Sequence, residues 1–121
     1  MQINLEDAEQ HAVQAYSDTK IQINSIVYES SLIVSGKEII TNLTIKSIVE
    51  LDDQYIGLLT KYDPEIIIIG HNETGKFPPY SIVSKLSQLK IGIECMSMGA
   101  ACRTYNVLLG EHRAVIAGFI L

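Results

Sequence analysis

The sequence predicts an α/β fold: a three-layer sandwich with a mixed central sheet flanked by helices, plus a small antiparallel β meander. Two patterns support this prediction. Residues 21–41 alternate β-branched and polar side chains, as half-buried strands do. From Leu51 onward, segments with helical spacing alternate with short apolar segments, which is typical of strands connected through helices.

Residues 21–41 are expected to form the antiparallel meander. Its apolar segments are Ile21–Ile23, Ile26–Tyr28, Leu32–Val34 and Glu38–Thr41, with a turn at Ser35–Lys37. Residues 1–19 are polar and mixed, and they are treated as an N-terminal arm without predicted regular structure. Residues 20–121 are expected to form a single α/β domain.

The rest of the chain predicts three helices and three strands in alternation. Tyr55, Leu58, Leu59 and Tyr62 share one helical face, and Pro64 ends this helix of about three turns near Tyr62. The unbroken run Ile66–Ile69 indicates a strand buried on both faces. A helix opened by Pro78 and Pro79, a covered strand at 91–96, a helix at 99–111 and a strand at 114–121 follow.

Length and composition exclude several classes of protein. A chain of 121 residues has the size of one compact domain. Its formal net charge of -5, with scattered bases, is unsuited to nucleic acid. No apolar run approaches the ~20 residues of a membrane span. The acidic start of the chain differs from a targeting segment, so a cytoplasmic location is expected.

One segment has the spacing of a phosphate-binding loop. Gly70 to Lys76 follows the apolar strand and reads G-x-x-x-x-G-K. The next residue should be a hydroxyl that starts a helix, but Phe77 and two prolines stand there, and prolines lack amide donors. Cys95, Cys102 and His112 also lack the spacing of a closed zinc site. No cofactor or metal is therefore expected.

A ligand crevice is a second hypothesis. If strands 66–69 and 91–96 are neighbours, their carboxyl ends gather His71, Asn72, Ser97 and Arg103 with the amide of Gly99. Such a crevice would suit an anionic metabolite, as a binding site or in a minor enzyme. Cys95 and His112 could also pair as nucleophile and base, although no third group can be assigned to orient them.

Two further features concern the last third of the chain. Glu94 lies inside the strand 91–96, where a carboxylate needs a partner such as Arg103, Arg113 or the Tyr105 hydroxyl. In the helix 99–111, Arg103, Asn106 and Gly110 form a nearly uncharged outward stripe, opposite the side that faces the sheet. We expect this stripe to pack against another chain.

The segment Met98 to Arg113 resembles the signature of a small single-domain family of unknown molecular function. That family includes the adipogenesis-associated domain protein of animals and a mitochondrial respiratory complex I assembly factor. The residues that match its pattern are Ala101, Thr104, Tyr105, Asn106, Leu108, Glu111 and Arg113. The chain departs from the pattern at Met98, where a Thr is usual, at His112, where a Gly is usual, and at Gly70 to Asn72, where Gly-Thr-Gly is usual.

The resemblance implies a non-catalytic protein that binds other proteins during assembly. In this hypothesis Arg103, Asn106 and Arg113 contact the unidentified protein partner or a second copy of the chain. Glu94, Tyr105 and Glu111 have structural roles, with Tyr105 and Glu94 holding the helix on the sheet.

Overall fold

A computed structural model describes residues 10–121, and residues 1–9 of the expected arm lie outside the described residues. The strands are β1 (Val13–Tyr16), β2 (Ile21–Ile23), β3 (Ile26–Tyr28), β4 (Ser31–Ser35), β5 (Ile39–Leu43), β6 (Ile66–His71), β7 (Gly92–Ser97) and β8 (Val115–Phe119). The helices are the 3-10 turn η1 (Ile48–Glu50) and the α-helices α2 (Asp53–Leu59), α3 (Tyr80–Gln88) and α4 (Met98–Gly110).

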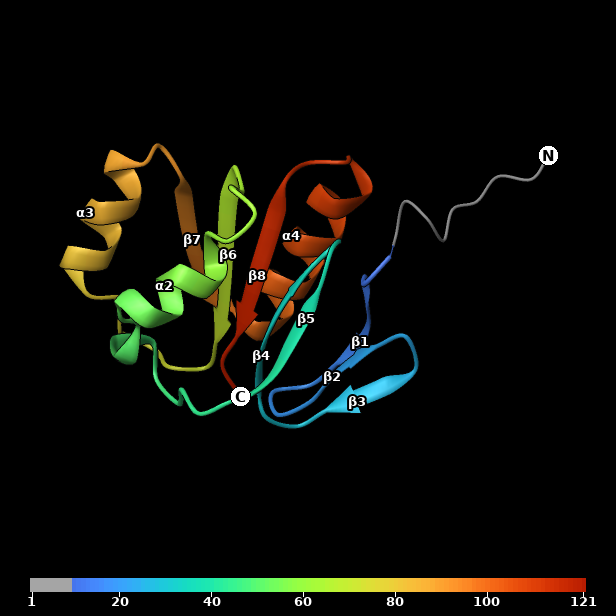
Figure 1. Ribbon diagram of the computed structural model, residues 1–121. Helices are drawn as coiled ribbons and strands as arrows, with labels where there is room; N and C mark the ends of the chain where they lie inside the picture. Colours follow the sequence, from blue (N-terminus) through green and yellow to red (C-terminus); the bar gives the residue numbers. More distant parts are fainter. Residues whose placement is uncertain (1–9) are drawn as a thin grey trace.

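The molecule has three layers (Figure 1). Five strands form a mixed central sheet in the order β5-β4-β8-β6-β7, in which β6 is parallel to both β7 and β8. The helices α2 and α3 cover one face of this sheet, whereas α4 and a separate antiparallel sheet, β1-β2-β3, cover the other. The predicted α/β fold class is confirmed.

The strand β6, which lies between β8 and β7, shows why an unbroken apolar run is needed here. Ile67 and Ile69 pack into the core under α2 and α3, while Ile68 packs into the core under α4, and all three are fully buried. Because successive strand residues point to opposite faces, a strand covered on both faces needs apolar side chains at every position. The isoleucine run therefore suits β6 to an interior position of the sheet.

The predicted meander is divided between two sheets. β2 and β3 pair in the small sheet, but β4 and β5 join the central sheet, where β4 lies antiparallel to β8. All five residues of β4 are buried, which suits a central strand rather than a half-exposed one. The small antiparallel meander is thus present, but it consists of β1, β2 and β3 rather than of residues 21–41, because β4 pairs with a strand distant in sequence.

Two helix and strand boundaries also differ from the expectation. Val13–Tyr16, placed in the arm by the sequence, pair with β2 as the first strand of the small sheet. The helix expected to reach Tyr62 ends earlier, because the Thr60 hydroxyl and amide both bond to the Ile56 carbonyl and close the last turn. Among residues 10–121, no helix has both the length and the apolar character to cross a lipid bilayer.

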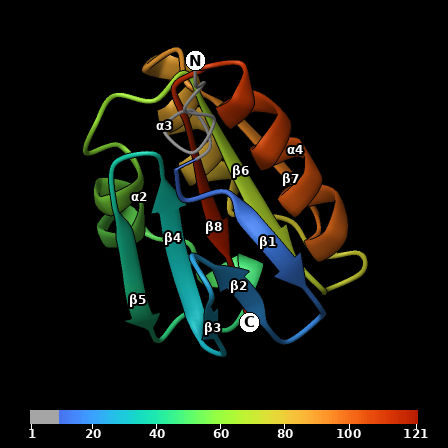
Figure 2. The same cartoon turned by 90° about the vertical axis from the view of Figure 1, so that its right-hand side faces the viewer.

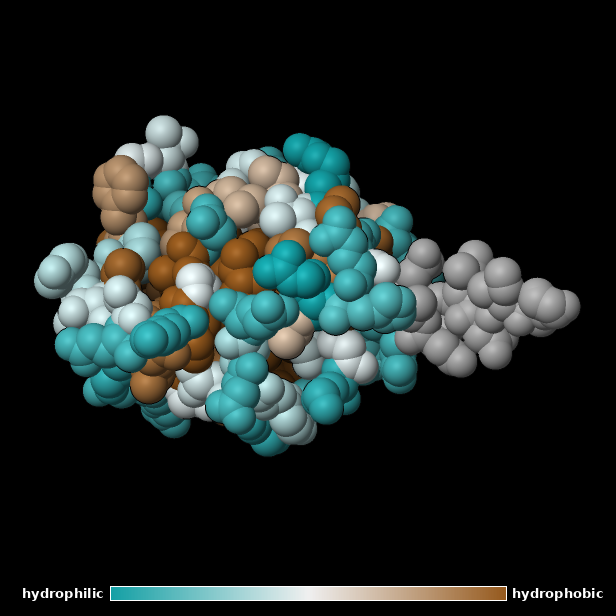
Figure 3. All heavy atoms as spheres, turned by 90° about the horizontal axis from the view of Figure 1, so that it is seen from above, coloured by the Kyte–Doolittle hydropathy of each residue, from teal (hydrophilic) through white to brown (hydrophobic). Residues whose placement is uncertain are grey.

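The layer of α2 and α3 is open between its two helices. A groove of about 410 Å³ lies there, with Ile56, Gly57 and Leu89 among its lining residues, and the Lys85–Asp53 ion pair of 2.8 Å links the helices. Figure 3 looks onto the top of Figure 1 and shows apolar surface on the side that carries these helices. The groove is lined by residues of the helices and of the segments that follow them, and Ile67 and Ile69 of the sheet below stay fully buried.

Both α3 and α4 turn into the following strand through the same C-terminal motif. After α4, the His112 amide bonds to the Leu109 carbonyl and the Arg113 amide to that of Leu108, with His112 at φ 61°. Lys90 occupies the same position after α3, at φ 60°. This is the Schellman arrangement, whose left-handed residue favours glycine. The glycine usual in the resembling family at position 112 fits this geometry.

We predict that His112→Gly stabilises the fold. In the folded state the left-handed conformation costs a non-glycine residue about 1–2 kcal/mol. Glycine avoids this cost, but it loses about 0.5–1 kcal/mol more in conformational entropy on folding, because its unfolded chain is freer. The expected gain is therefore up to about 1 kcal/mol, measured by urea denaturation. As a control, Gly110→Ala inside α4 should also be tolerated, because nothing lies near a Cβ at that position. A loss of stability in His112→Gly would contradict this account.

Candidate functional site

The helix α4 lies unusually close to β6. A Cβ on Gly70 would be only 2.8 Å from the Cβ of Ala101, so both small residues are required for this approach. The first turn is capped by the Ser97 hydroxyl, which accepts from the Ala100 amide at 3.4 Å. Ser97 therefore supplies the N-cap of α4, directly before Met98.

Tyr105 anchors the middle of α4. Its fully buried ring meets the ring of Phe119 on β8 edge to face, with centroids 6.4 Å apart. Its hydroxyl donates to the His11 carbonyl at 3.0 Å, and the His11 ring bonds in turn to the Ser35 carbonyl at 2.7 Å. Burial raises the pKa of the Tyr105 hydroxyl, so it stays protonated as a donor. Tyr105 thus ties the helix to the sheet and to the segment before β1.

Asn106 holds β1 through its side-chain amide. Its Oδ1 accepts from the Val13 amide at 2.8 Å, and its Nδ2 donates to the Val13 carbonyl at 2.9 Å. These two bonds imitate the pairing that a neighbouring strand would give, because an amide side chain carries one donor and one acceptor group. The sequence predicts that Asn106 faces another chain. In the structure, the chain's own first strand, β1, lies against its side chain instead.

Arg103 contacts the other end of the same strand. Its Nη1 donates to the Tyr16 hydroxyl at 2.8 Å, and the Tyr16 ring lies against Gly99, where a Cβ would be 3.1 Å from the ring. Figure 2 faces this side of the molecule and shows β1 running beside α4. We call these contacts, made by Arg103, Tyr105 and Asn106 with His11, Val13 and Tyr16, the β1 clamp.

The residues of the expected crevice have partners within the chain. His71 and Ser97 are register partners at the ends of β6 and β7. The buried His71 ring accepts the Glu73 amide at 3.2 Å, and Asn72 donates to the Asp18 carbonyl at 2.7 Å. The turn between β1 and β2 therefore lies over this end of the sheet. A hollow lies beside this turn, between Ala15 and Lys20. Its lining residues do not include His71, Asn72, Ser97 or Arg103.

Arg113 follows the C-terminal end of α4, whereas Arg103 lies near the middle of that helix. The Arg113 Nε bonds to the Glu65 carboxylate at 3.2 Å, and the same oxygen accepts the Ala114 amide. These bonds hold the pKa of Glu65 below its ordinary value, with the Ala114 amide as the largest cause. Glu111 is the exposed C-cap of α4. The two arginines expected to contact one partner thus have different partners within the chain, Tyr16 for Arg103 and Glu65 for Arg113.

Glu94 is exposed rather than covered. β7 is the edge strand of the central sheet, and its residues alternate between exposed and partly buried positions. Arg103, Arg113 and Tyr105, the partners considered for this carboxylate, are bonded instead to Tyr16, Glu65 and His11. An edge position explains how a strand can carry a carboxylate without a buried ion pair.

The two cysteines are protected thiols. Burial, aided by the Glu94 charge, raises the pKa of Cys95 to about 11, and burial raises that of Cys102 to about 12. Cys95 is level with Ile69, whereas His112 precedes Val115, which is level with Ile66. At about 3.3 Å per strand residue, the thiol and the imidazole lie toward opposite ends of the sheet. Within residues 10–121, no three His, Cys, Asp or Glu side chains are grouped to hold a metal ion.

Sequence reasoning missed the contribution of β1 to this site. The partners on α4 lie about 90 residues after His11, Val13 and Tyr16. In addition, Val13 is the only residue of β1 that is buried, so the segment lacks a clear apolar pattern. The residue that could have indicated a strand beside α4 was Asn106. A polar amide next to the buried Tyr105 on a packed helix needs hydrogen-bond partners, and a strand backbone can provide both.

Comparison with known proteins places the chain in a wider group. Residues 13–120 match a family described as protein of unknown function (DUF498/DUF598). The "13 kDa major membrane protein" of Francisella tularensis subsp. holarctica is 29% identical over 101 residues, which are 83% of this chain and 82% of that protein. The family match begins at Val13, the residue that Asn106 holds.

Solved structures share the fold. A Xanthomonas campestris protein solved by NMR has a TM-score of 0.82 and 27% identity, over 99% of this chain and 92% of that one. An outer membrane protein from Bartonella henselae has a TM-score of 0.79 and 26% identity, over 93% of this chain and 96% of that one. The similarity therefore extends over the whole domain rather than over one motif.

We predict that Asn106→Ala loosens β1. The substitution leaves the Val13 amide and carbonyl without these partners, which should cost about 1–3 kcal/mol in urea denaturation. Hydrogen exchange of the Val13 amide should rise at least tenfold. Val107→Ala, next to it on the exposed side of α4, is the control and should stay within about 0.5 kcal/mol of the parent. Unchanged exchange at Val13 would refute the role given to Asn106.

A second prediction concerns thiol reactivity. With a pKa of about 11, Cys95 is almost entirely protonated at pH 7.5, and the thiolate is the reactive form. Iodoacetamide should therefore label the folded protein slowly at pH 7.5 and faster as the pH approaches 11. The urea-unfolded chain provides the reference rate. Rapid labelling of folded Cys95 at neutral pH would instead indicate an activated nucleophile.

Proposed function

This chain belongs to the DUF498/DUF598 family of proteins of unknown function, and from that premise we propose that it is a non-catalytic binding protein that assists assembly. The resemblance to the adipogenesis-associated domain protein and to a mitochondrial respiratory complex I assembly factor supports the assembly role. The proposed domain comprises residues 20–121 together with β1. Its proposed location is the cytoplasm, and the membrane names of the Francisella and Bartonella relatives define the alternative.

The β1 clamp is the observation that carries this proposal. Arg103 and Asn106, the residues first expected to contact a partner, are bonded to the chain's own first strand. They therefore act as positioning residues that hold the small sheet beside α4. The surface available to a partner is then the outer side of that sheet together with the outer side of α4, which lie side by side in Figure 2.

This outer surface carries exposed apolar side chains next to a hollow. Tyr16 is 44% exposed, Val27 is 50% exposed and Val107, on α4, is 58% exposed. A hollow of about 210 Å³ is lined by Ala15, Tyr16, Ser17, Lys20, Gln22 and Val27. Aromatic and aliphatic side chains beside a hollow are the features on which protein interfaces concentrate their binding energy. We define Tyr16, Lys20, Val27, Arg103 and Val107 as the docking face.

A crevice for an anionic metabolite remains the alternative function. Asn72 and Arg103 already donate to the Asp18 carbonyl and the Tyr16 hydroxyl, so such a crevice would depend on their remaining N–H groups. The docking face does not depend on these donors. For this reason we favour a protein partner, with a second copy of this chain as one form that the partner could take.

We predict that Val27→Glu abolishes partner capture. A carboxylate on the docking face would be buried without a partner charge in the complex, which costs about 3–5 kcal/mol of binding free energy, or at least about a hundredfold in affinity. Val49→Glu is a matched control, because Val49 is 51% exposed and lies on η1, away from this face. Tagged variants are compared by cross-linking and mass spectrometry in cytosolic and membrane fractions, after circular dichroism confirms folding.

The two variants separate the possible outcomes. Loss of the same cross-linked partner in Val27→Glu alone supports the docking face. Equal recovery with both variants contradicts it, and recovery from the membrane fraction alone would correct the proposed location.

A further inference from the structure

The strand β7 is an open edge of the central sheet. It lies at the end of the strand order, beside β6, and its six residues stay in regular register with that strand from Gly92 to Ser97. Figure 2 shows β7 at the margin of the sheet, behind α4 and on the far side from β5. Within residues 10–121, no strand pairs with the outer side of β7, so an extended segment can add to the sheet there.

The outer side of β7 presents backbone groups at every second residue. The Gly92 amide donates to the Glu65 carbonyl at 3.2 Å, which turns the Gly92 backbone toward β6. Because the backbone groups of a strand alternate between its two sides, those of Ile93, Cys95 and Ser97 face away from β6. The stretch that is open to pairing therefore runs from Ile93 to Ser97.

β7 lacks the features with which edge strands usually prevent pairing. A proline, a lysine or a bulge at an edge blocks or weakens the addition of another strand. β7 contains no proline or lysine and has no shift in register, and Glu94 is its single charged residue. The sequence of β7 thus leaves its edge available.

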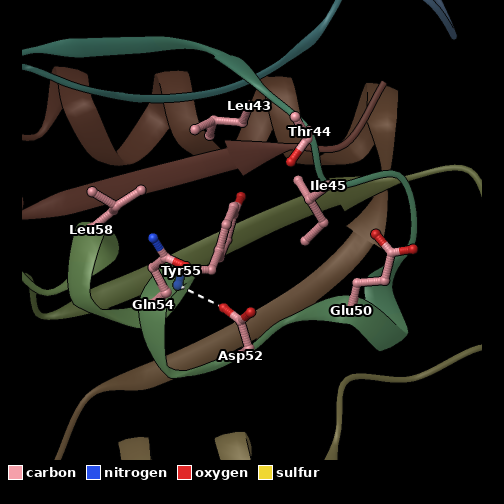
Figure 4. Close-up of a pocket in the computed structure, with 8 residues that line it drawn as sticks. All are labelled: Leu43, Thr44, Ile45, Glu50, Asp52, Gln54, Tyr55 and Leu58. Carbon is pink, nitrogen blue, oxygen red and sulfur yellow. Dashed lines mark hydrogen bonds between the residues drawn. The ribbon is translucent and has the colours of Figure 1, made fainter.

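The other edge strand, β5, is irregular. Its pairing with β4 contains a shift in register, and Asn42 has a left-handed backbone at φ 59°. Beyond this point the chain leaves the sheet, and residues 43–45 form one wall of a hollow opposite α2 (Figure 4). From α2, Tyr55 reaches Gly118 of β8, where a Cβ would overlap the tyrosine hydroxyl. Strand addition is therefore favoured at β7, and a contact between two β7 strands closes on itself.

A second copy of β7 fits this edge best in one antiparallel register. Residues with outward backbone groups must face one another, so Ile93, Cys95 and Ser97 pair with the same set in the other copy. A register with Glu94 opposite Glu94 would bring like charges together. With Cys95 at the two-fold axis, Glu94 lies opposite Met96, and Ile93 exchanges bonds with Ser97. This register uses all three outward residues and separates the two carboxylates.

The side of α4 next to β7 is uncharged. Ala100, Thr104 and Leu108 recur every four residues on one side of the helix, and all three are partly buried. Thr104 lies about 200° around the helix from Asn106, which faces β1, so this side faces the β7 edge. A two-fold axis perpendicular to the sheet sets α4 of one copy beside α4 of the other. The two uncharged sides can then meet without repulsion.

We propose that two copies of this chain pair through β7, so that one sheet continues across both. The strands are antiparallel, with Cys95 at the two-fold axis and the two α4 helices side by side. This contact goes beyond the proposed function, because it does not depend on the β1 sheet or on its apolar hollow. The two proposals can therefore fail independently.

Association is tested by sedimentation velocity over a wide range of protein concentration, at about 0.15 M salt, which screens the net charge of -5 on each copy. We expect the parent to change from monomer to dimer as the concentration rises. Thr104→Arg sets like charges against each other across the axis and should weaken the dimer at least tenfold. Val27→Glu, on the small sheet, is the control and should change the dissociation constant less than twofold. A parent that stays monomeric throughout, or an equally strong dimer in Thr104→Arg, would overturn the proposal.

Hydrogen exchange tests the geometry without any substitution. The amides of Ile93, Cys95 and Ser97 should exchange at least tenfold more slowly in the dimer than in the dilute protein, whereas the Glu94 amide, which faces β6, should change little. Ile93→Pro removes an outward donor at a kind of position where edge strands tolerate proline, and it should abolish the dimer. Ile93→Val keeps the amide and should retain the dimer. Slower exchange in another segment alone would place the interface elsewhere and refute pairing through β7.

Discussion

The pairing of the Asn106 side chain with the Val13 backbone is the interaction on which this side of the molecule depends. Strands of three or four residues, such as β1, β2 and β3, do not form a stable sheet alone. The small sheet is stable here because Ile21 and Ile23 are fully buried against the core and because α4 holds its first strand at Val13. Without that pairing, β1 would be held by its pairing with β2 and by the contacts of Arg103 and Tyr105.

Local patterns in the sequence predicted most of the individual elements. The isoleucine run of β6, the helix after Pro79 and the helix that carries Tyr105 each follow from side chains within about ten residues. What those patterns could not supply was the choice of strand partners. β4 pairs with β8 about 85 residues later, and that choice divides the expected meander between two sheets. Such contacts depend on which faces meet in three dimensions, and no local period encodes this.

The candidate site shows the same limit in its chemistry. The sequence predicts that Arg103 and Asn106 contact another chain and that Tyr105 holds the helix on the sheet. Their partners turned out to be His11, Val13 and Tyr16 of the same chain. Spacing along a helix shows which residues share a side, but it does not show whether another chain or an earlier strand lies there. The motif therefore builds the platform on which the proposed docking face is displayed.

Gly118 links two positions that lie far apart in the sequence. The space it leaves empty is taken by the Tyr55 hydroxyl, so any side chain at 118 would compete with that oxygen for one volume. Evolution can therefore change these two positions only in a coordinated order, with the phenol lost before a methyl group is gained. Among descendants of this gene, a phenylalanine at 55 would remove the severest overlap with an alanine at 118, and Ile69 and the ring, at 3.2 and 3.3 Å from such a Cβ, would still have to shift slightly.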